Sequence, residues 1–166
     1  MKICEVCEEY NAQIRDLYTM SNETMKVSKT LTERVLLSDL SKPSEYYSKP
    51  GRYMFLLLDN DKLIGMVGIV EYHQSEKGNE LAEIQRLVIH PDFRQQRLGY
   101  KLMFEVHNKV PELGYKNYTL STINSNKIAV MFYQTLGFME FWKTTQHYSR
   151  ADKKPYKLIH FIGIRT

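Results

Sequence analysis

Residues 87–106, LVIHPDFRQQRLGYKLMFEV, contain the change of pattern that decides the fold. An apolar run stops at His90-Pro91, a loop rich in arginine and glutamine follows, and an amphipathic segment begins near Gly99. A short apolar run that ends at a proline is typical of a buried strand, whereas apolar residues repeated every four positions predict a helix. The repeated positions are Leu98, Leu102, Val106 and Val110. The stretch therefore predicts a strand that passes through a basic loop into a helix over residues 97–110.

The basic loop has the features of an anion-binding site. The first amides of a helix have no intrahelical acceptor and lie at the positive end of its dipole, so a loop that enters a helix directly from a strand is suited to a phosphate group. Gly99 permits a close approach to the backbone, and Arg94 and Arg97 add positive charge. Taken alone, such a segment is more often the solvated start of a basic helix, so its meaning depends on the rest of the chain.

The rest of the chain alternates between helical and extended patterns. Helices are predicted over residues 9–20, 30–40 and 124–138. Strands are predicted over residues 53–59, 63–72, 81–89, 118–123, 139–145 and 156–164. Polar, proline-rich or glycine-containing segments predict a loop and two turns over residues 41–52, 73–80 and 146–155. Helices, then a hairpin, then strand–helix–strand–helix and two more strands indicate an α/β protein with a mixed (α+β) sheet.

The composition is that of an ordinary globular protein, with 43% hydrophobic and 25% charged residues in 166, enough to form a core. We expect one domain over residues 1–166. No apolar run approaches the ~20 residues of a membrane span, and charges follow closely on the first apolar residues, so we expect no membrane partner and a cytoplasmic protein. The net charge of +4 is spread along the chain without a block of like charges, which argues against a nucleic-acid partner.

The two cysteines, Cys4 and Cys7, form a single C-x-x-C pair. A structural zinc site usually takes four ligands, and neither a second cysteine pair nor a histidine at ligand spacing completes one. We therefore expect no metal. Both cysteines are predicted to be reduced residues near the first strand, with the buried position that free cysteine usually takes.

A second motif lies in the helix predicted over residues 124–138. Five positions fill the pattern N-x-x-A-x-x-x-Y-x-x-x-G-F, namely Asn126, Ala129, Tyr133, Gly137 and Phe138. Together with the loop RQQRLG at residues 94–99, this resembles the paired motifs of the GNAT superfamily of N-acetyltransferases. The resemblance implies a GNAT-type fold, with a central twisted mixed sheet of about six or seven strands flanked by about four helices. The resemblance is firm from residue 53 to 142. Before residue 53 it rests only on the topology, that is, on the order of the predicted elements.

The same helix has local start and stop signals. Asn124, Ser125 or Asn126 can cap its first turn, and Gly137 suits the left-handed position after its end. Its apolar face is predicted to consist of Ile128, Phe132 and Leu136.

The resemblance implies that the protein binds acetyl-CoA, the acetyl donor, where the sheet splays between strands 81–89 and 118–123. The backbone of Leu87, Val88 and Ile89 would then bind the pantetheine arm. The diphosphate would lie against the amides of Gln95, Gln96, Arg97, Leu98, Gly99 and Tyr100. Arg94 would contribute its side chain or shape the loop, and Asn126 would cap its helix, bind the arm, or do both.

Arg97 occupies the place of the first glycine in the family's loop. A left-handed conformation there would be costly for arginine. We therefore expect Arg97 to lie in the right-handed first turn of the helix, with its amide still directed at the phosphates.

The resemblance also implies direct acetyl transfer to a primary amine, with Glu83 as the base and Tyr133 as the acid that protonates the leaving thiolate. The amide of Val88 would stabilise the oxyanion. Strand alternation places Glu83, Gln85 and Leu87 on one face. The simpler interpretation of Glu83 is a surface glutamate, in which case a water relay would act as the base. The simpler interpretation of Tyr133 is a core tyrosine.

The acceptor amine is not specified by the sequence. The elements that bind acceptors in the family contain here Tyr18, Tyr46, Tyr47, Tyr148 and Arg150. A non-catalytic acyl-CoA-binding regulatory module on the same fold is the alternative function, and the presence of Glu83 and Tyr133 favours catalysis over it. A homodimer is compatible with the resemblance, because dimers are common in the family.

Overall fold

The protein is built around one mixed seven-stranded sheet with the strand order β1-β2-β3-β4-β5-β7-β6. The computed structural model describes residues 1–72, 80–147 and 155–163. The strands are β1 Lys2–Glu5, β2 Tyr53–Asp59, β3 Lys62–Glu71, β4 Leu81–Ile89, β5 Asn117–Ile123, β6 Met139–His147 and β7 Pro155–Gly163. The α-helices are α1 Asn11–Thr24, α2 Lys29–Leu36, α3 Pro43–Tyr47, α4 Leu98–Glu112 and α5 Lys127–Thr135, with 3-10 turns η1 Glu8–Tyr10 and η2 Pro91–Phe93. The mixed sheet confirms the predicted fold class.

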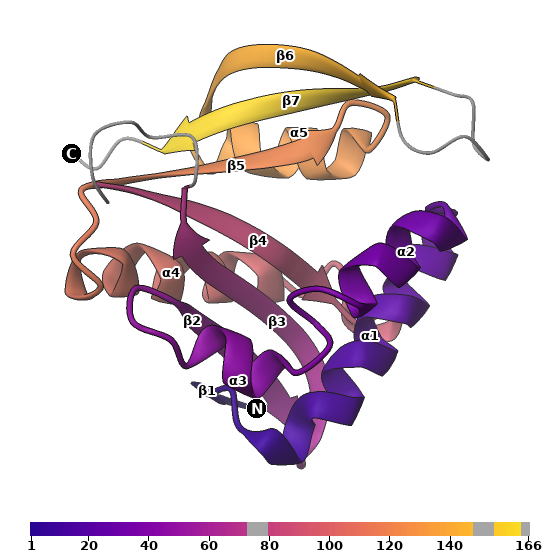
Figure 1. Cartoon of the computed structure of the whole chain (residues 1–166), viewed down its shortest axis with the longest axis vertical. Coiled ribbons are helices and arrows are strands. Elements are labelled where there is room, and N and C mark those ends of the chain that lie inside the picture. Colours follow the sequence, from indigo (N-terminus) through magenta and orange to yellow (C-terminus); the bar gives the residue numbers. More distant parts are fainter. Residues whose placement is uncertain (73–79, 148–154, 164–166) are drawn as a thin grey trace.

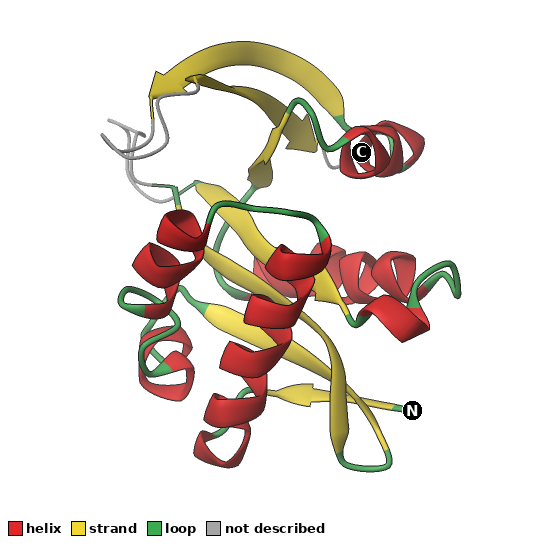
Figure 2. Ribbon diagram, turned by 90° about the vertical axis from the view of Figure 1, so that its right-hand side faces the viewer, coloured by secondary structure: helices red, strands yellow, loops and turns green. Residues whose placement is uncertain are grey.

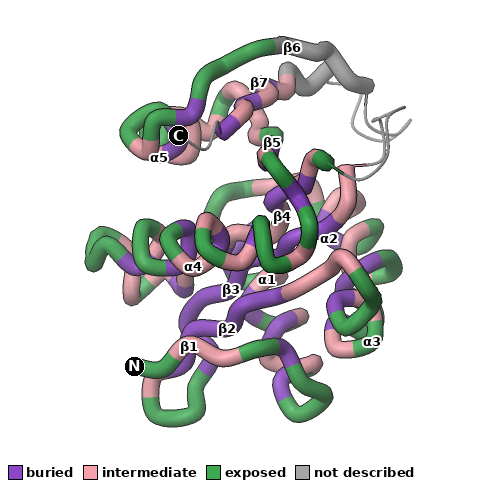
Figure 3. The backbone as a smooth tube through the Cα atoms, turned by 90° about the vertical axis from the view of Figure 1, so that its left-hand side faces the viewer, coloured by how far each residue is buried: buried purple, intermediate pink, exposed green. Residues whose placement is uncertain are grey.

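Helices cover both faces of the sheet, with α1, α2 and α3 on one side and α4 on the other (Figure 1). Two groups of buried side chains follow from this arrangement. The α4-side core joins α4 and α5 to the sheet and includes Leu102, Val106, Tyr133 and Phe161, whereas the α1-side core includes Ile14 and Tyr47. Figure 3 shows that buried stretches concentrate in the central strands. The four repeated positions of α4 are all buried, which confirms the predicted face.

The segment 41–52 was predicted as a loop, but it contains the short helix α3. Pro43 occupies the first helical turn, where its fixed φ and missing N–H are tolerated, so the proline begins a helix instead of preventing one. The helix places Tyr47 in the α1-side core with no exposed surface. The prediction of Tyr47 as an acceptor-facing aromatic is therefore wrong, because its ring is a core side chain.

The sheet splays between β4 and β5. These parallel strands pair only from Leu81 to Ile84 on one side and from Asn117 to Leu120 on the other. Beyond that point they diverge toward their carboxyl ends, and β5, β6 and β7 curve away with α5 (Figures 1 and 2). The predicted gap is therefore present, bordered by residues 85–89 and 121–123.

A β-bulge in β4 changes which residues face each side. The register with β3 shifts between Met66 and Gly68, and Arg86 has a left-handed φ of 57°. Before the bulge, Ile84 belongs to the α4-side core, while after it Leu87 packs on that core and Val88 belongs to the α1-side core. The prediction that Leu87 shares a face with Glu83 and Gln85 is wrong, because the bulge inverts the alternation.

The apolar face of α5 also differs from the prediction. Ile128 is 84% exposed, whereas Tyr133 is buried and Phe132 and Leu136 are half-buried. The cap predictions are confirmed: the side chain of Asn126 accepts from the amide of Ala129, and Gly137 follows with a φ of 83°. At the first strand, Cys4 is half-buried and Cys7 is exposed, so the expected burial is wrong for Cys7.

Several predictions lie partly or wholly outside the described residues. These are the turns over 73–80 and 146–155, with the acceptor candidates Tyr148 and Arg150. Within the described ranges, no helix has the length and apolar character to cross a membrane.

Candidate active site

Two residues in the loop before α4 adopt left-handed conformations. Gln95 has a φ of 62° and Arg97 has a φ of 59°. Arg97 is the residue before the helix and not part of its first turn, so that prediction is wrong. The conformation costs an L-residue about 1–2 kcal/mol, and the exposure of both side chains lets them turn toward solvent without a steric clash.

The helix that follows begins with amides that have no hydrogen-bond acceptor among the described residues. The amide of Lys101 donates to the carbonyl oxygen of Arg97, which leaves the amides of Leu98, Gly99 and Tyr100 before the first intrahelical bond. The side chain of Arg97 forms no cap. A cavity of about 330 Å³ lined by Arg97 and Tyr100 opens at this turn. The amide donors, the positive end of the helix dipole and the adjacent cavity together suit a diphosphate.

The side chain of Arg94 turns inward. Its Nε donates to the carbonyl oxygen of Ile89 at 3.2 Å, and its Nη2 donates to Ser21 Oγ, also at 3.2 Å. Of the two roles left open for Arg94, the structure supports shaping the loop, because these bonds connect it to β4 and α1.

A side chain at Gly99 would crowd a neighbour in the same chain. A Cβ at this position would lie 3.2 Å from Cζ of Phe132, which packs against the first turn of α4 from α5. Tyr100 meets the same ring edge-on, with 4.9 Å between the ring centroids. The glycine therefore brings the helices of the two sequence motifs together.

The backbone of β4 beyond the bulge alternates between β3 and the gap. The amide of His90 donates to the carbonyl oxygen of Ile64 in β3 at 2.8 Å. Alternation along an antiparallel strand then directs the amide of Val88 toward β3 as well and that of Ile89 toward the gap. The expectation that the Val88 amide receives an oxyanion does not fit this register.

Tyr133 lies in the α4-side core beside the gap. Its ring packs against Phe132, Phe138 and Phe161, with centroid separations of 5.3, 5.8 and 5.8 Å. Burial raises the pKa of Tyr133 to about 12. No hydrogen bond joins its hydroxyl to another described residue, and no buried side-chain polar atom among those residues is left unsatisfied. The hydroxyl is therefore protonated at neutral pH.

Glu83 approaches from the opposite side of the sheet. It pairs with Val70 of β3, which belongs to the α1-side core, and with Thr119 of β5. Burial first and the charge of Glu83 second raise the pKa of nearby Tyr72. Glu83 and Tyr133 thus lie on opposite faces of the sheet.

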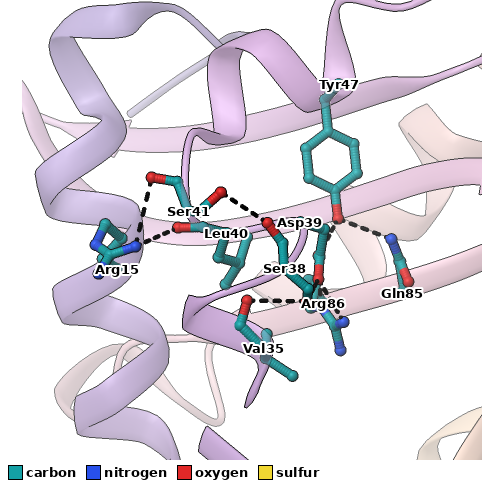
Figure 4. A network of polar contacts seen from close by, with 9 residues as sticks. All are labelled: Arg15, Val35, Ser38, Asp39, Leu40, Ser41, Tyr47, Gln85 and Arg86. Carbon is teal, nitrogen blue, oxygen red and sulfur yellow. Dashed lines mark hydrogen bonds and ion pairs between the residues drawn. The ribbon is translucent and has the colours of Figure 1, made fainter. Parts of the chain in front are cut away.

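Asp39, between α2 and α3, forms a buried ion pair with Arg86 at the bulge (Figure 4). Arg86 Nε and Nη2 donate to the two carboxylate oxygens, each at 2.8 Å. Tyr47 donates to Asp39 Oδ2 at 2.8 Å, and Gln85 Nε2 donates to the Tyr47 hydroxyl at 2.9 Å. The sequence shows only an isolated acid and base 47 positions apart, so local pattern could not have found this cluster.

Electrostatics reinforce the pair. Burial alone would raise the pKa of Asp39, but the hydrogen bonds and charge of Arg86 hold it below its ordinary value. Burial opposes the charge of Arg86 as well, and Asp39 outweighs this and raises the pKa of Arg86. Burial and the neighbouring carboxylate raise the pKa of Tyr47 well above its usual range. Both partners are therefore charged at neutral pH.

Comparisons with known proteins agree with this geometry. The family model described as "Acetyltransferase (GNAT) family" matches residues 11–138. The chain is 30% identical to an uncharacterized N-acetyltransferase of Schizosaccharomyces pombe over 71% of its own length and 68% of the relative's. It is 30% identical to N-alpha-acetyltransferase 30 of Dictyostelium discoideum, over 57% of this chain and 50% of that protein.

The fold is also similar to solved structures. The protein yncA of Salmonella typhimurium, solved with its cofactor acetyl-CoA, superposes with a TM-score of 0.78 at 15% identity, covering 99% of this chain and 93% of that one. With the family match over most of the chain, this establishes the class as acetyltransferases of one fold. The chain belongs to the GNAT acetyltransferase family and is an acetyltransferase enzyme.

Proposed function

We propose that the protein transfers the acetyl group of acetyl-CoA directly to a primary amine. The observation that carries the proposal is the combination of three unpaired amides at the start of α4 with the splay of β4 from β5. The amides of Leu98, Gly99 and Tyr100 would hold the diphosphate. The backbone of Ile89 and Leu87 would line the path of the pantetheine arm along the gap.

When bound there, acetyl-CoA supplies the activated thioester. From the phosphate end, the arm would pass Ile89 first and reach Leu87 next to the bulge. The thioester is therefore expected near Leu87, at the place where Glu83 and Tyr133 approach the gap from opposite faces.

Tyr133 is assigned the role of acid. A thiol has an ordinary pKa of about 8.5. The thiolate that leaves in the reaction is therefore stabilised at neutral pH by a hydrogen-bond donor. Because burial raises the pKa of Tyr133 to about 12, its hydroxyl holds its proton and donates to the leaving sulfur.

Glu83 is assigned the role of base. A lysine-like amine with a pKa of about 10.4 is more than ~99.9% protonated at pH 7, so a proton must leave before attack. Glu83 lies on the α1 side of the sheet, the side on which the candidate acceptor residues Tyr18 and Tyr46 also lie. Proton removal through a water between Glu83 and the amine is compatible with the same placement.

We further propose that residues 1–166 act as one domain, because β1 and β7 both belong to the same seven-stranded sheet. The name of the Dictyostelium relative makes α-amines of peptides the first acceptors to examine. The cytoplasmic location and the homodimer stay predictions.

The direct test combines calorimetry with CoA and a thiol-release assay on a panel of amines, peptides with free N-termini included. Heat on adding CoA and release of thiol only in the presence of an amine support the proposal. Binding without turnover on any amine would favour the regulatory module instead. No heat with either CoA or acetyl-CoA would remove the donor assignment.

The base is tested separately by Glu83→Gln, which keeps the shape of the side chain. We expect turnover at pH 7 to fall about 10-fold and the acid limb of the pH–rate profile to flatten, because the variant has no carboxylate to titrate. Glu80→Gln, at an exposed carboxylate that pairs with Lys116, is the matched control and should leave the limb unchanged. An unaltered limb in Glu83→Gln would point to another base.

A further inference from the structure

The bulge of β4 is held in a conformation that arginine rarely adopts. Arg86 has a φ of 57°, in the left-handed region where a Cβ is strained. The bulge determines that Leu87 and Ile89 pack toward the α4-side core and that the amide of Ile89 is directed at the gap. The local sequence offers no glycine at the bulge, so any stabilisation of this conformation comes from contacts elsewhere.

Those contacts come from the other side of the sheet. Asp39 accepts both guanidinium hydrogen bonds of Arg86, and the exposed fractions of the side chains are 5% and 23%. Bidentate pairing fixes the orientation of the guanidinium as well as its charge. The interaction therefore selects one direction for the Arg86 side chain and, through it, one conformation of the bulge.

The same carboxylate is itself fixed in place. Ser38 and Tyr47 donate to Asp39, and Gln85, next to Arg86, donates to the Tyr47 hydroxyl. Arg15 of α1 donates to the carbonyl oxygen of Leu40, after Asp39 (Figure 4), and to that of Leu36, before it. The segment between α2 and α3 is thus bound to α1 and to the bulge at once.

We propose that Asp39 and Arg86 are positioning residues: their ion pair holds the β4 bulge in its left-handed conformation and so aligns the backbone of Leu87–Ile89 that receives the acetyl donor. The inference rests on the proposed function, since it assigns the donor to this gap. It adds that a carboxylate on the acceptor side of the sheet controls donor affinity without touching the donor.

The chain contains a matched control. Arg52 and Glu71 form a second bidentate pair away from the gap, and the exposed fractions of these side chains are 15% and 26%. Asp39→Asn and Glu71→Gln each remove one charge and keep the shape of the side chain. If the loss of any bidentate ion pair in the sheet lowered donor affinity, both variants would lower it.

Calorimetric Kd for CoA is the first readout. We expect Asp39→Asn to raise Kd about 10-fold and Glu71→Gln to change it less than about 2-fold, in proteins shown to be folded by their denaturant transitions. The double variant Asp39→Asn/Arg86→Gly should recover most of the affinity, because glycine adopts the left-handed conformation without the ion pair. Equal effects of the two single variants, or no recovery in the double variant, would overturn the inference.

Hydrogen exchange provides a readout without ligand. Amides of residues 85–90 should exchange faster in Asp39→Asn than in Glu71→Gln, and equal protection would also overturn the inference. If the unaltered protein bound no CoA, the proposed function would fail first. If it bound CoA while Asp39→Asn bound equally well, only the positioning role would fail.

Discussion

Arg86 and Arg97 have nearly the same backbone conformation, with φ of 57° and 59°, at opposite ends of one functional segment. The side chain of Arg86 is held by Asp39, whereas that of Arg97 is exposed and forms no cap. In the proposed site, the backbone of the loop supplies the groups that bind the donor, whereas at the bulge a distant side chain is proposed to fix the backbone. The donor end of the site should therefore tolerate side-chain changes that the bulge end does not.

The largest effect should come from a side chain that takes part in the reaction. Tyr133→Phe keeps the ring in its aromatic surroundings and removes only the hydroxyl, so we expect turnover to fall about 100-fold, or ~2.7 kcal/mol in the barrier. The Kd for CoA should change less than about 3-fold, which calorimetry would measure. A similar loss in both quantities would show that the hydroxyl positions the donor and is not the acid.

Arg86→Gly should be the most destabilising change of the two arginines. Removing one partner of a buried pair costs about 3–5 kcal/mol, and relief of the left-handed strain returns about 1–2 kcal/mol. We expect a net loss of about 2 kcal/mol in the free energy of unfolding, measured in urea. A neutral outcome would contradict the view that the pair stabilises the bulge.

Acid should weaken the same pair. The pKa of Asp39 is lowered in the folded protein because Arg86 outweighs the effect of burial. Its contribution to stability is therefore fully present above the ordinary aspartate pKa of about 3.9 and is lost as pH falls through the lowered folded value. Urea unfolding between pH 6 and 3 should show a shallower decline in Asp39→Asn than in the unaltered protein, and identical slopes would count against the pair.

Arg97→Gly should have the smallest effect, with the opposite sign. Glycine removes about 1–2 kcal/mol of left-handed strain and adds about 0.5–1 kcal/mol of backbone entropy loss, so stability should rise by about 0.5 kcal/mol. The Kd for CoA should change no more than about 3-fold, since the amides remain. A destabilised Arg97→Gly would remove the contrast between the two arginines.

The parts predicted from sequence are those that local pattern determines. The repeat of apolar residues in α4 reports one buried face, and Asn126 and Gly137 mark the ends of α5 through capping chemistry that involves only neighbouring residues. Residue types and spacing were enough to indicate the family, and the resemblance to that family implied the gap beside β4.

The missed features depend on contacts between distant segments. The bulge at Arg86 is stabilised by a residue 47 positions away, and the period of two in β4 contains no sign of it. Arg97 was placed in the helix because arginine disfavours a left-handed conformation, but a cost of about 1–2 kcal/mol does not prevent that conformation in the loop. Ile128 was placed in the core by spacing alone, although Tyr133 and Ala129 form the side of α5 that packs inward.

Tyr133 packs in the α4-side core, whereas Glu83 lies on the α1 side of the sheet. A donor that enters from the α4 side and an acceptor that enters from the α1 side would not cross each other's path. Initial-rate plots with both substrates varied should then give intersecting lines, the signature of a ternary complex. The first product could also depart while the second still occupies its own entrance.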